Sequence, residues 1–138
     1  MLEINMKKVM VFGTFDIFHP GHEFYLKKAK KYGDLLEVVV AKDSTVRELK
    51  GKEPLNDELK RLSVIKALDY VDRAYLGYEE DKYKIIEEVK PDVICLGYDQ
   101  YYFTNNLKEE LKKRKIKAKI IRLKSYKEYL YKSSKLRK

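Results

Sequence analysis

Cysteine is almost missing from this chain of 138 residues, and tryptophan is missing altogether. The single cysteine, Cys95, excludes a disulfide within the chain and fits a reducing cytoplasm. No run approaches the roughly twenty apolar residues that a membrane helix needs. The first residues, MLEINMKK, lack the apolar core of a signal peptide. We therefore expect a cytoplasmic protein with no membrane partner.

Basic residues outnumber acidic ones by 31 to 22, which gives a formal charge of +9. Such an excess favours polyanionic partners such as nucleotides or nucleic acid. Charged residues make up 38% of the chain, and many form Glu/Lys pairs on predicted helix faces, so a solvated surface explains most of the lysines. A nucleic-acid-binding module stays a remote alternative because no RNP-type motif occurs. We expect no nucleic-acid partner.

Short apolar runs alternate with amphipathic segments along the whole chain, which predicts one α/β domain over residues 1–138. The arrangement is a doubly wound sheet of about five parallel strands with helices on both faces. A polar stretch, 42–56, is predicted to be a mobile loop with at most a short helix at 45–49, and Asn56 is predicted to cap the next helix. The predicted strands are 9–13, 35–41, 71–76, 93–96 and 118–123, and the predicted helices begin near 20, 56, 81 and 105.

Ligands of such sheets bind at the carboxyl ends of the strands, near the point where the strand order reverses. Polar clusters fall at these ends, at 13–22, 42–52 and 97–100, and in the tail at 126–138. We therefore expect the functional site at this edge.

Both histidines of the chain, His19 and His22, lie in the turn after the first predicted strand. Gly21 between them lets the backbone approach a ligand, and Thr14 offers a hydroxyl donor. The free N–H groups of the helix that begins at Pro20 form a ready anion site, and the imidazoles add donors that are best when protonated. Two histidines without further ligands do not complete a zinc site. The turn therefore indicates phosphate chemistry; histidines that only satisfy local backbone groups are the alternative.

The sequence GTFD at 13–16 followed by HPGH at 19–22 resembles the signature of the cytidylyltransferase-like nucleotidyltransferase superfamily. The resemblance spans nearly the whole chain. It implies a Rossmann-like fold, a homodimer, and transfer of a nucleotidyl group from a nucleoside triphosphate to a phosphate monoester with release of pyrophosphate. A divalent metal ion, expected to be Mg²⁺, bridges the phosphates.

The resemblance also assigns roles to residues of this chain. His19, His22 and Lys50 become the catalytic residues, with Lys52 as a second candidate lysine. The acceptor would be bound by Asp16, which alternatively positions a metal, and by Arg61 and Tyr98. The nucleotide would be bound by Gly13, Thr14, Phe15, Gly21, Gly97, Asp99, Ser134 and Arg137.

Two segments bear on specificity. GYDQ at 97–100 looks most like the archaeal FAD synthetases; Asp99 and Gln100 as simple turn caps are the alternative. The aromatic residues at 101–103 either stack on an isoalloxazine ring or form a dimer core. SSKLR at 133–137 resembles the family's triphosphate-capping motif, although Lys135 replaces a common threonine, so the tail either works while flexible or orders when nucleotide binds.

The sequence thus predicts an FMN adenylyltransferase, with ATP or CTP and with FMN or a small alcohol phosphate as the substrates. A glycerol-3-phosphate cytidylyltransferase is the alternative. A homologue that binds nucleotide without turnover also stays open. Cys95, inside a predicted strand, is expected to be a buried small apolar residue.

Overall fold

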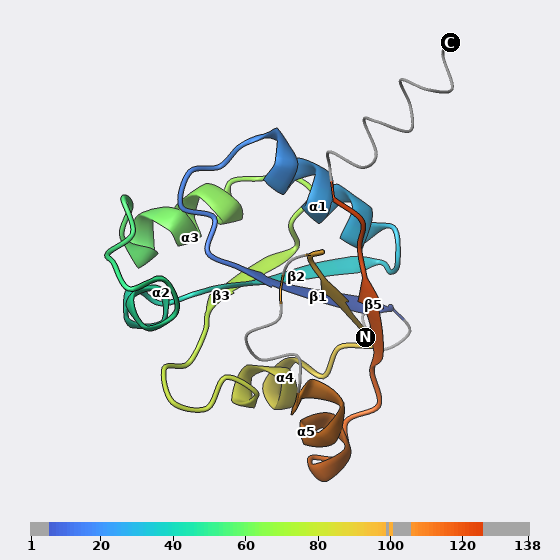
Figure 1. Cartoon of the computed structure of the whole chain (residues 1–138). Coiled ribbons are helices and arrows are strands. Elements are labelled where there is room, and N and C mark those ends of the chain that lie inside the picture. The colour runs from blue at the N-terminus through green and yellow to red at the C-terminus, as the bar shows by residue number, and fades with distance from the viewer. Residues whose placement is uncertain (1–5, 99, 101–105, 126–138) are drawn as a thin grey trace.

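The computed structural model describes residues 6–98, 100 and 106–125 of the chain. Its centre is one sheet of five parallel strands in the order β3-β2-β1-β4-β5 (Figure 1). The strands are β1 (Lys8–Gly13), β2 (Leu35–Val40), β3 (Arg73–Leu76), β4 (Val93–Leu96) and β5 (Lys119–Arg122). The helices are α1 (Pro20–Lys30), α2 (Asp43–Lys50), α3 (Glu58–Lys66), α4 (Lys84–Val89) and α5 (Leu107–Lys113). The predicted fold class is confirmed.

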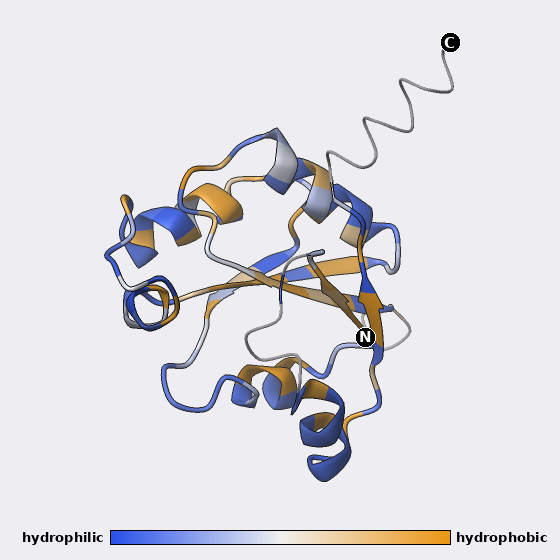
Figure 2. Ribbon diagram, viewed as in Figure 1, coloured by the Kyte–Doolittle hydropathy of each residue, from blue (hydrophilic) through white to orange (hydrophobic). Residues whose placement is uncertain are grey.

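Helices cover both faces of the sheet, with α1 and α3 on one side and α4 and α5 on the other (Figure 1). Residues of β1 alternate between two apolar clusters: Val9 and Val11 belong to the first, and Met10 and Phe12 to the second. A strand that is buried on both faces must be apolar at every position, which is why this run shows no alternation in the sequence. Figure 2 shows the central strands as largely hydrophobic and the outer helix faces as hydrophilic.

The prediction for 42–56 was a loop with at most a short helix at 45–49; a helix is present there, but α2 is longer, with 8 residues from Asp43 to Lys50. At its start, the N–H of Asp43 donates to the Glu58 carboxylate at 2.8 Å. At its end, Gly51 adopts φ 72° and its N–H donates to the Arg47 carbonyl at 2.8 Å. A left-handed residue at this place favours glycine, which stops the helix cleanly.

The cap of α3 is Asp57 rather than Asn56, since the Asp57 carboxylate accepts from the N–H of Lys60 at 2.8 Å. Within the described ranges, no helix has the length and apolar character needed to cross a bilayer.

The strand order reverses beside β1. The chain builds β2 and β3 on one side of β1 and then returns to add β4 and β5 on the other. β1 pairs with β2 over six residues, but its register with β4 covers only Val9 with Val93 and Met10 with Ile94. The two strands therefore separate toward their carboxyl ends, which opens the crevice expected at a switch point.

Candidate active site

The turn after β1 is shaped by a buried aromatic ring. Phe15 has φ 53°, an uncommon left-handed conformation for a bulky residue, and its side chain is only 3% exposed. The ring lies back against Gly13, where a Cβ atom would stand 2.5 Å from the ring's Cζ. The same ring meets His22 edge-on, with the centroids 5.3 Å apart. Phe15, predicted to line the nucleotide pocket, thus lies in the core beneath the turn and supports His22.

His19 caps the helix that it precedes. Its Nδ1 accepts from the N–H of Gly21 at 3.1 Å, and Pro20 takes the first helical position. The His19 carbonyl accepts from the N–H of His22 at 3.0 Å. The expectation of free helix N–H groups is therefore corrected at these two positions, because His19 itself satisfies both. Anion binding here depends on the imidazoles rather than on those backbone donors.

The two imidazole rings stack, with centroids 3.8 Å apart and planes 20° from parallel. Burial, together with the nearby positive charges of His19 and Lys50, lowers the pKa of His22 to about 4. His22 is therefore neutral at pH 7 while no anion is bound. The predicted charged state requires a bound phosphate, whose negative charge raises the pKa.

Asp16 ties the turn to the segment that follows α2. Its carboxylate oxygens accept from the N–H groups of Leu55 and Asn56, each at 2.8 Å. Burial raises the pKa of Asp16, but those two bonds and the charges of Arg61 and Lys50 bring it below its ordinary value. Asp16 is thus an ionised carboxylate that holds the loop.

Lys50 lies exposed in the last turn of α2, and Lys52 is exposed just beyond it. Because both lysines are exposed, both stay candidates for binding a phosphate. The charge of Lys50 lowers the pKa values of His22 and Asp16.

Arg61 has a role other than the predicted one. Its side chain is only 1% exposed, and the guanidinium does not present a free fork to a substrate phosphate. It donates to the carbonyls of Asn56 (2.9 Å), Thr14 (2.9 Å) and Ala41 (2.7 Å), and to the Asp43 carboxylate (2.7 Å). Arginine suits this junction because its planar donors reach several acceptors at once. Arg61 therefore fixes the ends of β1 and β2 and the start of α2 relative to one another.

Beyond β4, Gly97 follows the strand and Tyr98 is 51% exposed. The N–H of Gln100 donates to the Gly97 carbonyl at 3.2 Å, which closes a turn. The predicted nucleotide-binding residues Asp99, Ser134 and Arg137, and the aromatic run 101–103, lie outside the described residues. Cys95 is buried, as expected, and burial raises the pKa of its thiol to about 12, so the thiol is not a nucleophile.

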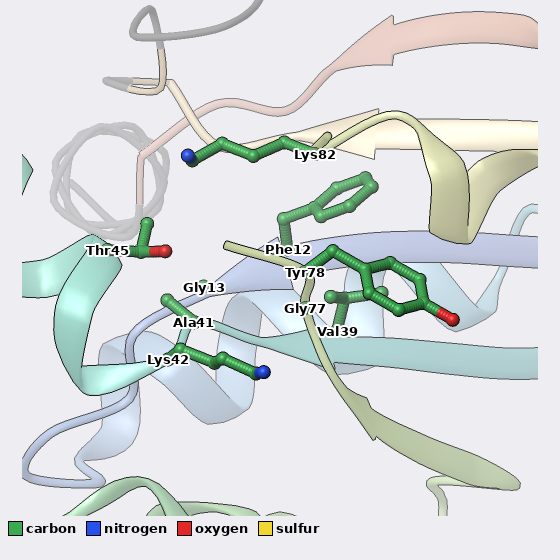
Figure 3. Close-up of a pocket in the computed structure, with 9 residues that line it drawn as sticks. All are labelled: Phe12, Gly13, Val39, Ala41, Lys42, Thr45, Gly77, Tyr78 and Lys82. Carbon is green, nitrogen blue, oxygen red and sulfur yellow. The ribbon is translucent and has the colours of Figure 1, made fainter. Parts of the chain in front are cut away.

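A cavity of about 30 Å³ opens at the carboxyl ends of β1 and β2 (Figure 3). Phe12, Val39 and Ala41 give it an apolar floor, while Lys42 and Lys82 contribute cations from two separate segments. Lys82 Nζ donates to the Glu79 carbonyl at 2.9 Å and lies 3.9 Å from the Glu48 carboxylate. The complete lining is Phe12, Gly13, Val39, Ala41, Lys42, Thr45, Gly77, Tyr78 and Lys82.

The sequence reasoning did not assign Lys42 or Lys82 to a site. Lys42 directly follows the second strand region and so carried the signal of a carboxyl end. Lys82 comes six residues after the end of β3, and no cluster was predicted there. The strand end itself was predicted at residue 76, where β3 ends, but no polar cluster was assigned to the residues that follow.

Metal ligands do not gather in the described part of the chain, where no group of three or more His, Cys, Asp or Glu side chains could hold a metal ion. The nearest carboxylates are engaged, Asp16 by two backbone N–H groups and Asp43 by Arg61. These residues do not fit a metal site built by the protein alone.

Comparison with known proteins gives one consistent family. The model of the Cytidylyltransferase-like family matches residues 10–138. A protein of Methanothermus fervidus named FAD synthase is 54% identical over 121 residues, which cover 86% of this chain and 83% of the relative. Another of that name, from Thermoplasma volcanium, is 50% identical over 133 residues, covering 96% and 93%.

Solved structures agree. One described as the lipopolysaccharide core biosynthesis protein from Thermoplasma volcanium GSS1 superposes with a TM-score of 0.84 at 51% identity, over 88% of this chain and 99% of that one. A pantoate-beta-alanine ligase from Francisella tularensis gives a TM-score of 0.62 at 20% identity, over 86% of this chain and 59% of the ligase. At that identity the second likeness concerns the fold alone.

Proposed function

The chain belongs to the cytidylyltransferase-like family, and we propose that it transfers AMP from ATP to the phosphate of FMN, forming FAD and pyrophosphate. One observation of the structure carries this proposal: two stacked imidazoles lie at the head of α1, beside the carboxyl end of β1. The relatives named FAD synthase, at about 50% identity over most of the chain, supply the acceptor.

The reaction needs no general base. The FMN phosphate is already ionised at neutral pH, so one of its oxygens attacks the α-phosphorus of ATP in line. A new P–O bond forms, the bond between the α-phosphorus and the bridging oxygen to the β-phosphate breaks, and pyrophosphate leaves with that electron pair. Catalysis is then positioning and neutralisation of charge.

The histidine pair contacts the phosphates in this proposal. His19 has its Nδ1 engaged by the N–H of Gly21, so its neutral form carries the proton on Nε2, where it can donate to a phosphate oxygen. His22 becomes protonated as the triphosphate raises its pKa. Donors fixed in place stabilise the charge that builds on the leaving pyrophosphate. Lys50, exposed at the end of α2 and close enough to influence the pKa of His22, adds a further cation.

The cavity beside Gly13 is our candidate for the acceptor side. Lys42 and Lys82 in its lining suit the acceptor's phosphate. At about 30 Å³ the cavity is far smaller than FMN, so the flavin ring lies outside it in this proposal. Mg²⁺ would enter as the complex of the nucleotide, because Mg²⁺ commonly keeps several waters and binds substrate phosphates.

We further propose a homodimer that works in the cytoplasm without a nucleic-acid partner. β3 is an edge strand of the sheet, and a groove of about 600 Å³ runs beside it with Leu62, Leu76 and Ile85 in its lining. Light scattering coupled to size exclusion tests the dimer: a mass near the chain's 16.5 kDa at micromolar concentration contradicts it.

The decisive experiment pairs each nucleotide with each acceptor. The protein is incubated with Mg²⁺, ATP or CTP, and FMN or glycerol 3-phosphate, and pyrophosphate and the nucleotidyl product are measured. We expect turnover with ATP and FMN. Turnover only with CTP and glycerol 3-phosphate would replace FMN as the assigned acceptor. If none of the pairs releases pyrophosphate, the proposed function is overturned.

His22→Ala serves as the matched variant in this assay. We expect it to lose turnover by about 10²-fold or more, as for a lost electrostatic stabiliser, while its affinity for ATP falls much less. A wild-type protein that binds ATP and releases no pyrophosphate is a nucleotide-binding homologue without catalysis.

A further inference from the structure

The Phe12 carbonyl lies at the crevice between β1 and β4, beyond the paired register of the two strands. The N–H of Asp92 donates to the Lys8 carbonyl at 2.9 Å, so Lys8 directs its carbonyl toward β4. In a parallel strand every second residue bonds to the same neighbour, and Phe12 therefore faces β4 as well. Its register with β4 has ended by then, at Met10 and Ile94. A buried carbonyl needs a hydrogen-bond donor, which must here come from outside the strand ladder.

The side chain of Gln100 provides this donor. Its side-chain Nε2 donates to the Phe12 carbonyl at 2.8 Å, and its Oε1 accepts from the N–H of Gly97 at 2.8 Å. One amide thus joins the end of β1 to the turn after β4, across the separation of the strands. Arg122 at the end of β5 holds this turn from the other side by donating to the carbonyls of Gly97 (2.8 Å) and Gln100 (2.9 Å).

Tyr25 brings α1 into the same junction. It lies three residues after His22 on that helix, and its hydroxyl is 3.2 Å from the Cys95 carbonyl, 3.2 Å from Gln100 Oε1 and 3.3 Å from the Phe12 carbonyl. A hydroxyl has one proton, so it donates to one of these oxygens at a time. Gln100 Nε2 donates to the Phe12 carbonyl and Gly97 N–H donates to Gln100 Oε1, so these two oxygens have other donors and the hydroxyl can donate to the Cys95 carbonyl. Tyr25 and Gln100 therefore work as a pair.

We propose that Tyr25 and Gln100 are positioning residues for the nucleotide. They span the crevice at the switch point and set the separation between the histidine turn at the head of α1 and the turn that begins at Gly97. This inference rests on the proposed function, in which the histidine turn binds the triphosphate, and on the prediction from the sequence that Gly97 binds the nucleotide. Neither residue touches a reacting atom in this proposal; each acts through the turns that it holds.

The test uses variants that keep the packing. Tyr25→Phe removes only the hydroxyl. Gln100→Glu keeps the acceptor for Gly97 N–H and replaces the donor to the Phe12 carbonyl by an oxygen. We expect the Kd and KM for ATP to rise about 5-fold or more in each variant, as for one lost hydrogen bond. We expect kcat and the KM for FMN to change less than about 2-fold, since the reacting atoms and the acceptor side are untouched.

Two further measurements separate positioning from general stability. Tyr32→Phe, at an exposed tyrosine just beyond α1, is the control and should leave the Kd for ATP unchanged. The double variant Tyr25→Phe/Gln100→Glu should weaken ATP binding by less than the product of the two single effects, because the residues share one junction.

Several outcomes overturn the proposal. A lower melting temperature with an unchanged Kd for ATP makes the pair merely structural. Equal losses in kcat and in both KM values, or exactly multiplicative effects in the double variant, contradict paired positioning. Calorimetry with ATP alone keeps the test independent of the acceptor, so absent turnover with FMN contradicts the proposed function and leaves this inference to be judged by ATP binding. If Gln100→Glu does not fold, Tyr25→Phe decides.

Discussion

Arg61→Met removes a buried guanidinium that serves four acceptors, and we expect it to destabilise the fold rather than only the binding of a substrate. The replacement leaves the carbonyls of Thr14, Ala41 and Asn56 and the Asp43 carboxylate without their donor. Removing one partner of a buried ion pair costs about 3–5 kcal/mol. Each hydrogen bond to a charged group contributes about 1.5–3 kcal/mol. The loss of stability is smaller than the sum over the four bonds, because the loops relax after the substitution. A loss of about 3–5 kcal/mol is the expected result.

Urea unfolding followed by circular dichroism, with no substrate present, measures this loss. With a slope of about 1.5–2 kcal/mol per molar of urea, the midpoint should fall by roughly 2 M. Arg47→Met is the matched control, because Arg47 pairs with Glu53 at 2.8 Å but both side chains are at least half exposed. Exposed pairs contribute about 0–1 kcal/mol, so its midpoint should move by less than about 0.5 M.

A substrate-binding arginine behaves in the opposite way. If Arg61→Met keeps the wild-type midpoint and raises only the KM for the acceptor, the structural role assigned to Arg61 is refuted. Arg61→Lys sharpens the distinction, since lysine keeps the positive charge without the planar fork. We expect it to recover only part of the lost stability, whereas a simple phosphate contact would tolerate the exchange far better.

Further predictions concern the histidine turn and the cavity. The pKa of His22 is about 4 when folded and 6.5 in the reference state, so the unfolded chain binds more protons between these values, and stability falls as pH drops from 6.5 to 4. After allowance for partial exposure, about 1–2 kcal/mol is expected, absent from His22→Gln in urea titrations. ATP binding near pH 6 should take up protons, seen by calorimetry in buffers of different ionisation enthalpy; no uptake contradicts protonation of His22. Gly21→Ala places a Cβ 2.9 Å from His19 Cε1 and should cost about 1 kcal/mol through the lost cap and reduce kcat/KM about 10-fold; unchanged kinetics contradict the capping role. Lys42→Met/Lys82→Met should raise the KM for FMN about 10-fold, with the KM for ATP within 2-fold; the reverse pattern moves the acceptor elsewhere.

The strands were predictable because burial on both faces leaves a plain apolar run. β4 was predicted at its observed bounds, and β1 within one residue. α2 was predicted only as a short helix at 45–49, because only Thr45 and Val46 among its residues are buried, too few to give a helical stripe. Its ends depend on a side chain of α3 and on one glycine in a left-handed conformation, and only the first of these is a long-range contact.

The site divides in the same way. The histidine pair could be predicted because its residue types and spacing are local to one turn. The role of Arg61 could not, since an arginine suits a phosphate and a set of backbone carbonyls equally well. The choice depends on which carbonyls the ends of β1 and β2 leave open, and that is a property of the assembled sheet. The role of Gln100 could not be predicted for the same reason. Its side-chain amide can cap its own turn or donate to β1 across the crevice, and the sequence does not distinguish the two.

The conformation of Phe15 explains why a turn with so few backbone donors can still hold its shape. A left-handed bulky residue is unfavourable by roughly 1–3 kcal/mol, and burial of the aromatic ring offsets this cost. The same ring packs against His22 and against Gly13, so the strained backbone, the strand end and the imidazole move together. Since the first helix N–H groups are already satisfied by His19, the affinity of the turn for an anion depends, in the proposed reaction, on the imidazoles, and the pKa of His22 rises as the anion binds. In that reaction the site neutralises a triphosphate while it is present and loses part of its attraction when pyrophosphate departs, which a fixed cluster of lysines would not do.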